Sequence, residues 1–297
     1  MAARTPKKRR SSKKSPSLPF GRKCKLAGVS AAAVFAVVGF VLNPNLRELS
    51  KVERAVAELI QSIQNPGSEL LAPTGKYVQT QFQSCPHFFP QQQPPIVPSQ
   101  NRLREMCFDS FAILHNGQTK TPVFVAQRLN KRMLEQAKEV PRSNRFYEEA
   151  RLPSADRATL ADYRNSGYSR GHMAPAGDMD TPEAMAQSFS LSNMVPQNQT
   201  HNAGAWSKVE GDTRQYVRRA KGDVYVVTGP VYGQRTSYIG ENRVAVPEYI
   251  YKLVYDPSDH RAWVYWHKND PKTVVGNPIS YEEFVKRTGL QILPTVH

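Results

Sequence analysis

The stretch at residues 162–206, DYRNSGYSRGHMAPAGDMDTPEAMAQSFSLSNMVPQNQTHNAGAW, brings two groups of polar side chains close together in the sequence. The first group is SRGHMAP at residues 169–175, and the second is NMVPQ at residues 193–197. Helices are expected at Pro182–Phe189, between the groups, and at Asn202–Ala220, after the second. On that second helix, at ~100° per residue, Glu210 lies about 80° and Arg214 about 120° from Asn202. They share one broad face, although ordinary i,i+4 pairing on a solvated face gives the same pattern.

The sequence around this stretch predicts an α+β fold. Two β-rich runs, Cys107–Leu114 and Thr121–Leu129, flank His115-Asn116-Gly117-Gln118, and Asn-Gly between such runs is a strong hairpin signal. Hairpins mixed with helices, without regular βαβ alternation, indicate a mostly antiparallel central sheet flanked by helices. Further strands are expected at Asp223–Thr228, Glu248–Tyr255 and Arg261–His267, and further helices at Asn130–Glu139 and about Tyr281–Arg287.

His172 is one of seven histidines, and a single histidine is more often structural than catalytic. Its setting distinguishes it, because Gly171 permits a close approach and Arg170 is a potential phosphate ligand. Hydrolysis of a phosphodiester needs a base for water, a cation for the developing negative charge, and stabilisation of the leaving group. Mg²⁺ accepts one or two protein oxygens and several waters, so Asn202 with Glu210 nearby would be enough to hold it.

These residues closely resemble the DNA/RNA non-specific endonucleases, the sugar-non-specific nucleases of the ββα-metal (His-Me finger) superfamily. The family motif is D-R-G-H, then N-x-x-P-Q-x-x-x-x-N-x-x-x-W-x-x-x-E. Here it reads SRGHMAP and NMVPQNQTHNAGAWSKVE, and the second half matches throughout, spacing included. The resemblance covers roughly residue 107 to the C-terminus, and more weakly the segment from about residue 79. It implies a ββα-metal active-site motif and cleavage of both DNA and RNA with Mg²⁺ or Mn²⁺.

The resemblance also implies a role for each matching residue of the second helix and its surroundings. His172 would be the general base that activates water. Asn202 would be the direct Mg²⁺ ligand, and Glu210 would hold and orient metal-bound waters. Asn193 would help to position or polarise the site near His172.

Several arginines are the phosphate ligands that the resemblance implies. Arg214 is one. RSNRF at residues 142–146, followed by Leu152-Pro153, resembles the family's R-x-x-x-F…L-P segment, in which the spacing favours Arg142, with Arg145 as the second choice. The chain departs from the family at Ser169, where Asp is usual and could orient Arg170 or a water. Losing such a supporting group typically costs about 10–100-fold rather than all activity.

The N-terminus predicts a membrane anchor. Residues 1–25 hold ten basic residues and no acid, which leaves residues 26–297 with 30 basic and 25 acidic residues and a net charge of only +5. Residues 26–42, LAGVSAAAVFAVVGFVL, carry no charge and are long enough to span a membrane as a helix. The basic flank would hold the N-terminus in the cytoplasm and place the rest on the periplasmic side. A cleaved signal peptide with secretion, or a mitochondrial targeting segment with an intermembrane location, are the alternatives.

Four segments follow: a basic cytoplasmic tail (1–25), the transmembrane signal anchor (26–42), an amphipathic helix and linker (43–78), and the endonuclease domain (79–297). The helix KVERAVAELIQSIQ at residues 51–64 has one apolar face and could form a stalk, a cap or a homodimer contact. Cys85 and Cys107 lie beyond the anchor and are a disulfide candidate in an oxidising compartment, worth ~3 kcal/mol in the chain-entropy model. Two free buried thiols are the alternative.

Two functions compete. The first is a membrane-anchored, Mg²⁺-dependent endonuclease. The second is a catalytically weakened, membrane-anchored nucleic-acid-binding protein, for example in DNA uptake, and Ser169 is its only support. The expected partners are DNA and RNA, the membrane, and a second copy of the chain, and the sequence identifies no inhibitor protein.

Overall fold

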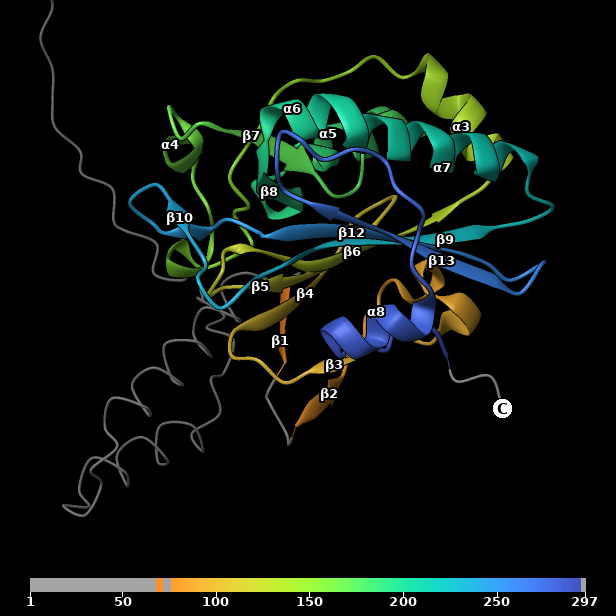
Figure 1. Ribbon diagram of the computed structural model, residues 1–297, viewed down its shortest axis with the longest axis horizontal. Coiled ribbons are helices and arrows are strands. Elements are labelled where there is room, and N and C mark those ends of the chain that lie inside the picture. Colours follow the sequence, from red (N-terminus) through yellow and green to blue (C-terminus); the bar gives the residue numbers. More distant parts are fainter. Residues whose placement is uncertain (1–67, 72–75, 295–297) are drawn as a thin grey trace, which may run out of the picture. The chain divides into compact units, whose positions relative to one another are not determined.

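The computed structural model describes residues 68–71 and 76–294, which contain a seven-stranded sheet (Figure 1). Every pair of neighbouring strands in this sheet is antiparallel. The α+β class with a mostly antiparallel central sheet is therefore confirmed. In order across the sheet the strands are β1 (Ser68–Leu71), β4 (Leu103–Cys107), β5 (Ala112–Asn116), β6 (Thr121–Leu129), β9 (Val224–Val231), β12 (Tyr249–Asp256) and β13 (Arg261–Lys268).

Strands β5 and β6 form the hairpin that the Asn-Gly pair predicts. Asn116 pairs with Thr121 at its end, and the Asn116 side chain accepts a hydrogen bond of 2.7 Å from the backbone N–H of Gln118. The first β-rich run is two strands rather than one. The chain turns between β4 and β5, where the N–H of Phe108 donates to the carbonyl of Phe111 at 2.9 Å.

One long insertion separates the two central strands. Residues 130–223 connect β6 to its neighbour β9, and their helices cover one face of the sheet (Figure 1). Both polar groups of residues 162–206 belong to this insertion. It contains α3 (Lys131–Gln136), α4 (Leu160–Tyr163), α5 (Pro182–Ser188), α6 (Gln199–His201), a π-helical turn at Asn202–Trp206 and α7 (Ser207–Arg219). It also contains the strand pair β7 (Tyr168–His172) and β8 (Met194–Asn198), and the 3-10 turns Ala137–Glu139, Ser154–Asp156, Ala176–Asp178 and Leu191–Asn193.

The other face of the sheet is covered by α8 (Tyr281–Thr288) and by the chain that precedes β4 (Figure 1). Successive residues of β6 point to opposite faces of the sheet, and each face has its own hydrophobic core. Phe124 packs with the N-terminal chain and α8, whereas Val125 packs with the insertion. The N-terminal chain contains β2 (Tyr77–Gln79) paired with β3 (Ile96–Pro98), and the turns Pro86–Phe88 and Pro90–Gln92. A small pair of strands, β10 (Tyr238–Ile239) and β11 (Val244–Ala245), follows β9.

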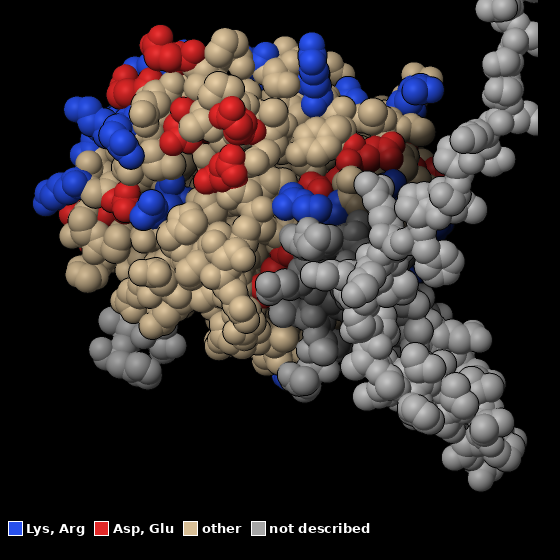
Figure 2. Space-filling view, turned by 180° about the vertical axis from the view of Figure 1, so that it is seen from behind, with Lys and Arg blue, Asp and Glu red and all other residues tan. Residues whose placement is uncertain are grey.

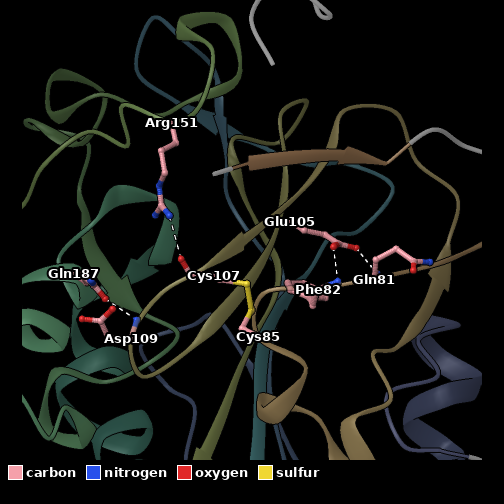
Figure 3. The surroundings of a disulfide bond; sticks show 8 residues. All are labelled: Gln81, Phe82, Cys85, Glu105, Cys107, Asp109, Arg151 and Gln187. Atoms are coloured by element: carbon pink, nitrogen blue, oxygen red, sulfur yellow. Dashed lines mark hydrogen bonds between the residues drawn. A yellow bond between two sulfur atoms is a disulfide. The ribbon is translucent and has the colours of Figure 1, made fainter. Parts of the chain in front are cut away.

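A disulfide fastens the N-terminal chain to the sheet (Figure 3). Cys85 and Cys107, at the end of β4, are bonded with a Cα–Cα distance of 5.9 Å. Beside them the buried carboxylate of Glu105 accepts hydrogen bonds from the backbone N–H groups of Gln81, at 2.7 Å, and Phe82, at 2.6 Å. Strand pairing begins before residue 79, where the domain was expected to start. Strand β1, which pairs with β4, and the first residues of β2, which pairs with β3, lie in the segment that was expected to be a helix and linker.

The expected basic tail, membrane anchor and amphipathic helix at residues 51–64 lie outside the described residues, and so does the homodimer contact expected of that helix. Within residues 68–71 and 76–294, no helix is long and apolar enough to cross a membrane. Acidic and basic side chains are interspersed over the upper part of the face in Figure 2. This face carries no field of a single sign, so on this face any attraction for a polyanion has to come from local groups.

Candidate active site

The two polar groups of residues 162–206 meet as the paired strands β7 and β8, followed by α7. His172, the last residue of β7, pairs with Met194 at the start of β8. Gly171 is required by this pairing, because the side chain of Gln197 on β8 lies directly against it and a Cβ at 171 would clash. Two antiparallel strands and a helix therefore frame the site.

His172 stands in an aromatic corner. Its ring lies 5.7 Å from the ring of Phe146 and 4.9 Å, edge to face, from that of Phe189. Its Nε2 atom is buried and has no hydrogen-bond partner among the described residues. Burial, and then the positive charge of Arg142, lower the pKa of His172 to about 3. The imidazole is therefore neutral at pH 7, and its buried Nε2 is left without a hydrogen-bond partner.

Asn193 holds the backbone that follows His172. Its fully buried amide accepts a hydrogen bond from the N–H of Ala174 and donates to the carbonyls of Ala174 and Ser188, each at 2.9 Å. Both amide hydrogens are thus engaged with the backbone. This geometry suits a positioning role for Asn193 and leaves it no hydrogen to offer a substrate.

Two arginines stand beside His172. The Arg142 guanidinium lies over the ring of Phe189 at 5.1 Å, and that of Arg170 lies over the ring of Phe146 at 4.1 Å. Arg145 is exposed, and no aromatic ring in the described chain holds it in this way. Of the two upstream arginines, Arg142 is therefore the one that the fold brings to the histidine.

Ser169 lies on the other side of β7 from these groups. Successive side chains of a strand point to opposite faces, so Arg170 and His172 share one face and Ser169 points away from it. A carboxylate at position 169 is therefore badly placed to orient Arg170. Arg170 is held by Phe146 instead.

The helix that follows β8 contains a π-helical turn just before α7, and this turn aligns the functional side chains of the helix. A π turn takes one residue more than an α turn. The eight-residue spacing of Asn202 and Glu210 then acts like seven α-helical residues, and the two lie about 20° apart rather than 80°. Arg214 lies about 20° to the other side of Asn202. Trp206, which closes the π turn, is fully buried and anchors this face against the core.

Glu210 is a carboxylate without an ion pair. It is half-buried, and no hydrogen bond or ion pair joins it to another described residue. Burial raises its pKa to about 7, Asp178 adds to the rise, and the charges of Lys252, Arg214 and Arg142 oppose it. Arg214 itself is engaged, because its Nη1 lies 3.0 Å from the Oδ1 of Asp178. The expected phosphate ligand Arg214 is thus half of a buried ion pair.

Lys252 and Asp178 belong to this site, and the sequence reasoning missed both. Lys252 on β12 is 1% exposed, donates to the hydroxyl of Thr228 at 2.7 Å, and lies 5.5 Å from the ring of Trp206. A lysine in the middle of the apolar strand EYIYKLVY was the signal for it, since buried lysines are rare unless paired. Nothing in the local sequence singles out Asp178, which meets Arg214 across 36 residues.

The donors available to a metal ion are few and are all oxygens. No group of three or more His, Cys, Asp or Glu side chains that could hold a metal is found among the described residues. Asn202 and Glu210 share a helix face, and no hydrogen bond within residues 68–71 and 76–294 engages either side chain. One amide oxygen and one carboxylate fit a weakly held Mg²⁺ that keeps most of its waters.

Comparison with known proteins identifies a family and several relatives. The sequence profile of the DNA/RNA non-specific endonucleases matches residues 94–296. "Nuclease EXOG, mitochondrial" of Danio rerio is 41% identical over 160 residues, 50% of this chain and 46% of that protein. "Endonuclease G, mitochondrial" of Homo sapiens is 34% identical over 157 residues, 49% of this chain and 52% of that protein.

A solved structure is similar as well. A chain of the EndoG/EndoGI complex, whose crystal structure addresses the inhibition of EndoG, matches with a TM-score of 0.60 and 27% identity, over 67% of this chain and 89% of that chain. The present chain spans about half the length of the first two relatives named above. Because the family profile covers more than half of its residues, this chain belongs to the DNA/RNA non-specific endonuclease family.

Proposed function

We propose that this chain is an endonuclease that hydrolyses phosphodiester bonds of DNA and RNA with Mg²⁺ or Mn²⁺, and that His172 is its general base. One observation carries the proposal. A neutral imidazole with an unpartnered ring nitrogen ends β7 near two arginines, and the charge of Arg142 acts both on this imidazole and on Glu210, which shares a helix face with Asn202. The names of the relatives, all nucleases, support the reaction class.

The histidine would take a proton from the attacking water. A base with a pKa of about 3 is too weak for efficient transfer at neutral pH. A bound phosphate would raise this pKa, because its negative charge would offset the charge of Arg142, the smaller of the two causes, while the effect of burial would remain. The base would then gain strength only when substrate is present.

The arginines would meet the negative charge that grows on the phosphate in the transition state. Arg142 and Arg170 are held over aromatic rings rather than by carboxylates. The Nε of Arg142 donates to the Oδ1 of Asn144 at 2.7 Å, and its two Nη groups, with the donors of Arg170, would be free for phosphate oxygens. Arg214 would act less directly, since Asp178 already binds it at 3.0 Å. Asn193 would keep the backbone after His172 in place.

A Mg²⁺ ion, when bound, would stabilise the charge on the phosphate and on the leaving oxygen. Asn202 would hold it directly and Glu210 would hold its waters. Lys252, Arg214 and Arg142 act on Glu210 only at a distance, and no described residue forms an ion pair with it, so a divalent ion would supply the direct partner. Contacts of this kind address the phosphate backbone and carry no base sequence, so low specificity is expected.

The test is a nicking assay on plasmid DNA and on RNA, with Mg²⁺ and with EDTA, for the wild type and His172→Ala. We expect Mg²⁺-dependent cleavage of both nucleic acids by the wild type, and none by a folded His172→Ala protein. Tight nucleic-acid binding without metal-dependent cleavage would instead favour the second candidate, a nucleic-acid-binding protein that has lost its activity. Full activity of His172→Ala would refute the assignment of the base.

The compartment belongs to the same proposal. Relatives from Danio rerio, Homo sapiens and Saccharomyces cerevisiae are named as mitochondrial nucleases. The basic, acid-free residues 1–25 fit a mitochondrial targeting segment as well as the flank of an anchor. We therefore favour a mitochondrial location over the periplasmic side, with residues 26–42 as the membrane anchor. Fractionation with carbonate extraction tests both points, because an unanchored protein would be released from the membrane pellet.

A further inference from the structure

Phe146 contacts both groups that would act on the phosphate. Its ring faces the Arg170 guanidinium at 4.1 Å and the His172 ring at 5.7 Å, and its far edge packs on Phe189 at 4.9 Å. Arg170 and His172 stand two residues apart on one face of β7, so their Cα atoms are about 7 Å apart. One half-buried ring thus spans the cation and the base.

The ring of Phe146 is the contact by which Arg170 is held in place of a polar partner. No hydrogen bond or ion pair joins its guanidinium to a side chain in residues 76–294, and Ser169 points to the other face of β7. An arginine side chain loses rotamer freedom when it is immobilised, so an unheld arginine would bind a phosphate at an entropic cost. The face of an aromatic ring can hold a guanidinium while leaving its N–H donors free.

We propose that Phe146 is the positioning residue of this active site, which holds Arg170 and His172 at a fixed spacing so that both act on one phosphate. The proposal rests on the proposed nuclease function. It explains why the chain tolerates serine at position 169: the arginine next to it depends on an aromatic ring from residues 142–146, not on a neighbouring carboxylate. Phe146 would act only through these two side chains and would not touch the reacting atoms.

The experiment compares Phe146→Leu, which keeps an apolar side chain but removes the ring, with Phe146→Tyr, which keeps the ring. Steady-state cleavage of a short DNA duplex by the full chain is measured with saturating Mg²⁺. We expect kcat of Phe146→Leu to fall about 10–100-fold, as for other groups that orient a reacting residue, with a much smaller change in KM. Phe146→Tyr should restore kcat to within about threefold of the wild type, because its ring face is retained.

The chain offers a matched control. Arg151 lies over the ring of Phe108 at the same 4.1 Å, but in a cluster of structural ion pairs. Phe108→Leu removes an equivalent contact, and it should lower the thermal midpoint without changing kcat. A kcat loss that merely follows stability would appear in both leucine variants.

A double-mutant cycle separates positioning from packing. If Phe146 works through Arg170, then Phe146→Leu combined with Arg170→Gln should lose little more kcat than Arg170→Gln alone. Additive losses, an unchanged kcat in Phe146→Leu, or a Phe146→Tyr protein as slow as Phe146→Leu would each overturn the inference. An inactive wild type would instead overturn the proposed function, so the two failures are distinguishable.

Discussion

Two clusters of buried and half-buried charged side chains differ in what is left unpaired. In the arginine-paired cluster, Asp156 lies 3.0 Å from Arg102 and 3.4 Å from Arg104, and Glu149 lies 2.8 Å from Arg151. The site cluster consists of Asp178, Glu210, Arg214 and Lys252, and there only Asp178 and Arg214 form an ion pair between described residues. Half-buried Glu210 and buried Lys252 have no ion-pair partner among the described residues.

The two carboxylates respond in opposite directions. Burial pushes the pKa of Glu149 upward, but the hydrogen bonds and charge of Arg151 outweigh it, and the pKa lies below its usual value. Burial raises the pKa of Glu210 to about 7. The pKa values of the histidines do not distinguish the two clusters. Burial lowers the pKa of both His115, to about 4, and His172, to about 3. An unpaired carboxylate that is withdrawn from water costs stability, so Glu210 is the candidate position at which the proposed metal ion would supply the missing charge.

The largest expected difference separates the two histidines. His172→Asn should lower kcat by about 10²–10⁴-fold, the usual contribution of a general base, with little loss of stability. His115 is fully buried and its Nε2 bonds the carbonyl of Asp156 at 2.9 Å, so His115→Asn should cost about 1–3 kcal/mol of unfolding free energy and leave kcat near the wild type. Plasmid nicking and urea denaturation of both variants check this. Equal losses of kcat in the two variants would show that His172 and His115 do not differ in function as proposed.

The disulfide beside the arginine-paired cluster should affect stability alone. The carbonyl of Cys107 accepts from Arg151 at 3.1 Å, which ties the bond to that cluster (Figure 3). Replacing Cys85 and Cys107 together by serine opens a loop spanning 22 residues and should cost ~3 kcal/mol, which lowers the thermal midpoint by about 6–12 °C. Kinetic parameters well below the midpoint should not change. Cys24→Ser is the control and should match the wild type in both measurements.

Replacing Glu210 or Glu149 by glutamine, measured at pH 7.5, should have smaller effects than the substitutions described above. Glu210→Gln should lower kcat about 10–100-fold at limiting Mg²⁺, because a neutral amide orients metal-bound waters poorly, while stability holds or rises. Glu149→Gln should cost about 1–3 kcal/mol, because it leaves Arg151 and Ser190 with a weaker acceptor, and should spare kcat. A stability loss in Glu210→Gln would show that the carboxylate is paired after all.

The sequence predicts features that depend on neighbouring residues, and it does not predict contacts between residues that are far apart in the chain. The Asn116-Gly117 turn and the period of the strands and helices are local, and the hairpin and most elements lie where they are expected. The π turn at Asn202–Trp206 was not predictable, because the helical period of the sequence does not say whether a turn bonds four or five residues back. Periodicity also places a residue on a face without saying which faces meet. The contacts of Arg214 with Asp178 and of Arg170 with Phe146 therefore required the structure.

The smallest effect is a dependence of stability on pH. Glu210 titrates near pH 7 in the folded protein and near 4.5 in the unfolded chain. Below pH 4.5 both states hold the proton. Between pH 4.5 and 7 only the folded state keeps it, so rising pH favours unfolding by up to ~3 kcal/mol. The buried neutral histidines act in the opposite sense, because the unfolded chain gains their protons as the pH falls below 6.5.

The difference between wild type and Glu210→Gln isolates the carboxylate from the histidines. In metal-free urea denaturation, the variant should gain stability relative to the wild type as the pH rises from 5 to 7.5. Adding Mg²⁺ should shrink this gain, because a cation beside the ionised carboxylate lowers its pKa and stabilises the folded state. Glu149→Gln should show the reverse trend, losing its deficit as the pH falls below 4.5. A Mg²⁺-insensitive difference at Glu210 would mean that its unpaired charge is not part of a metal site.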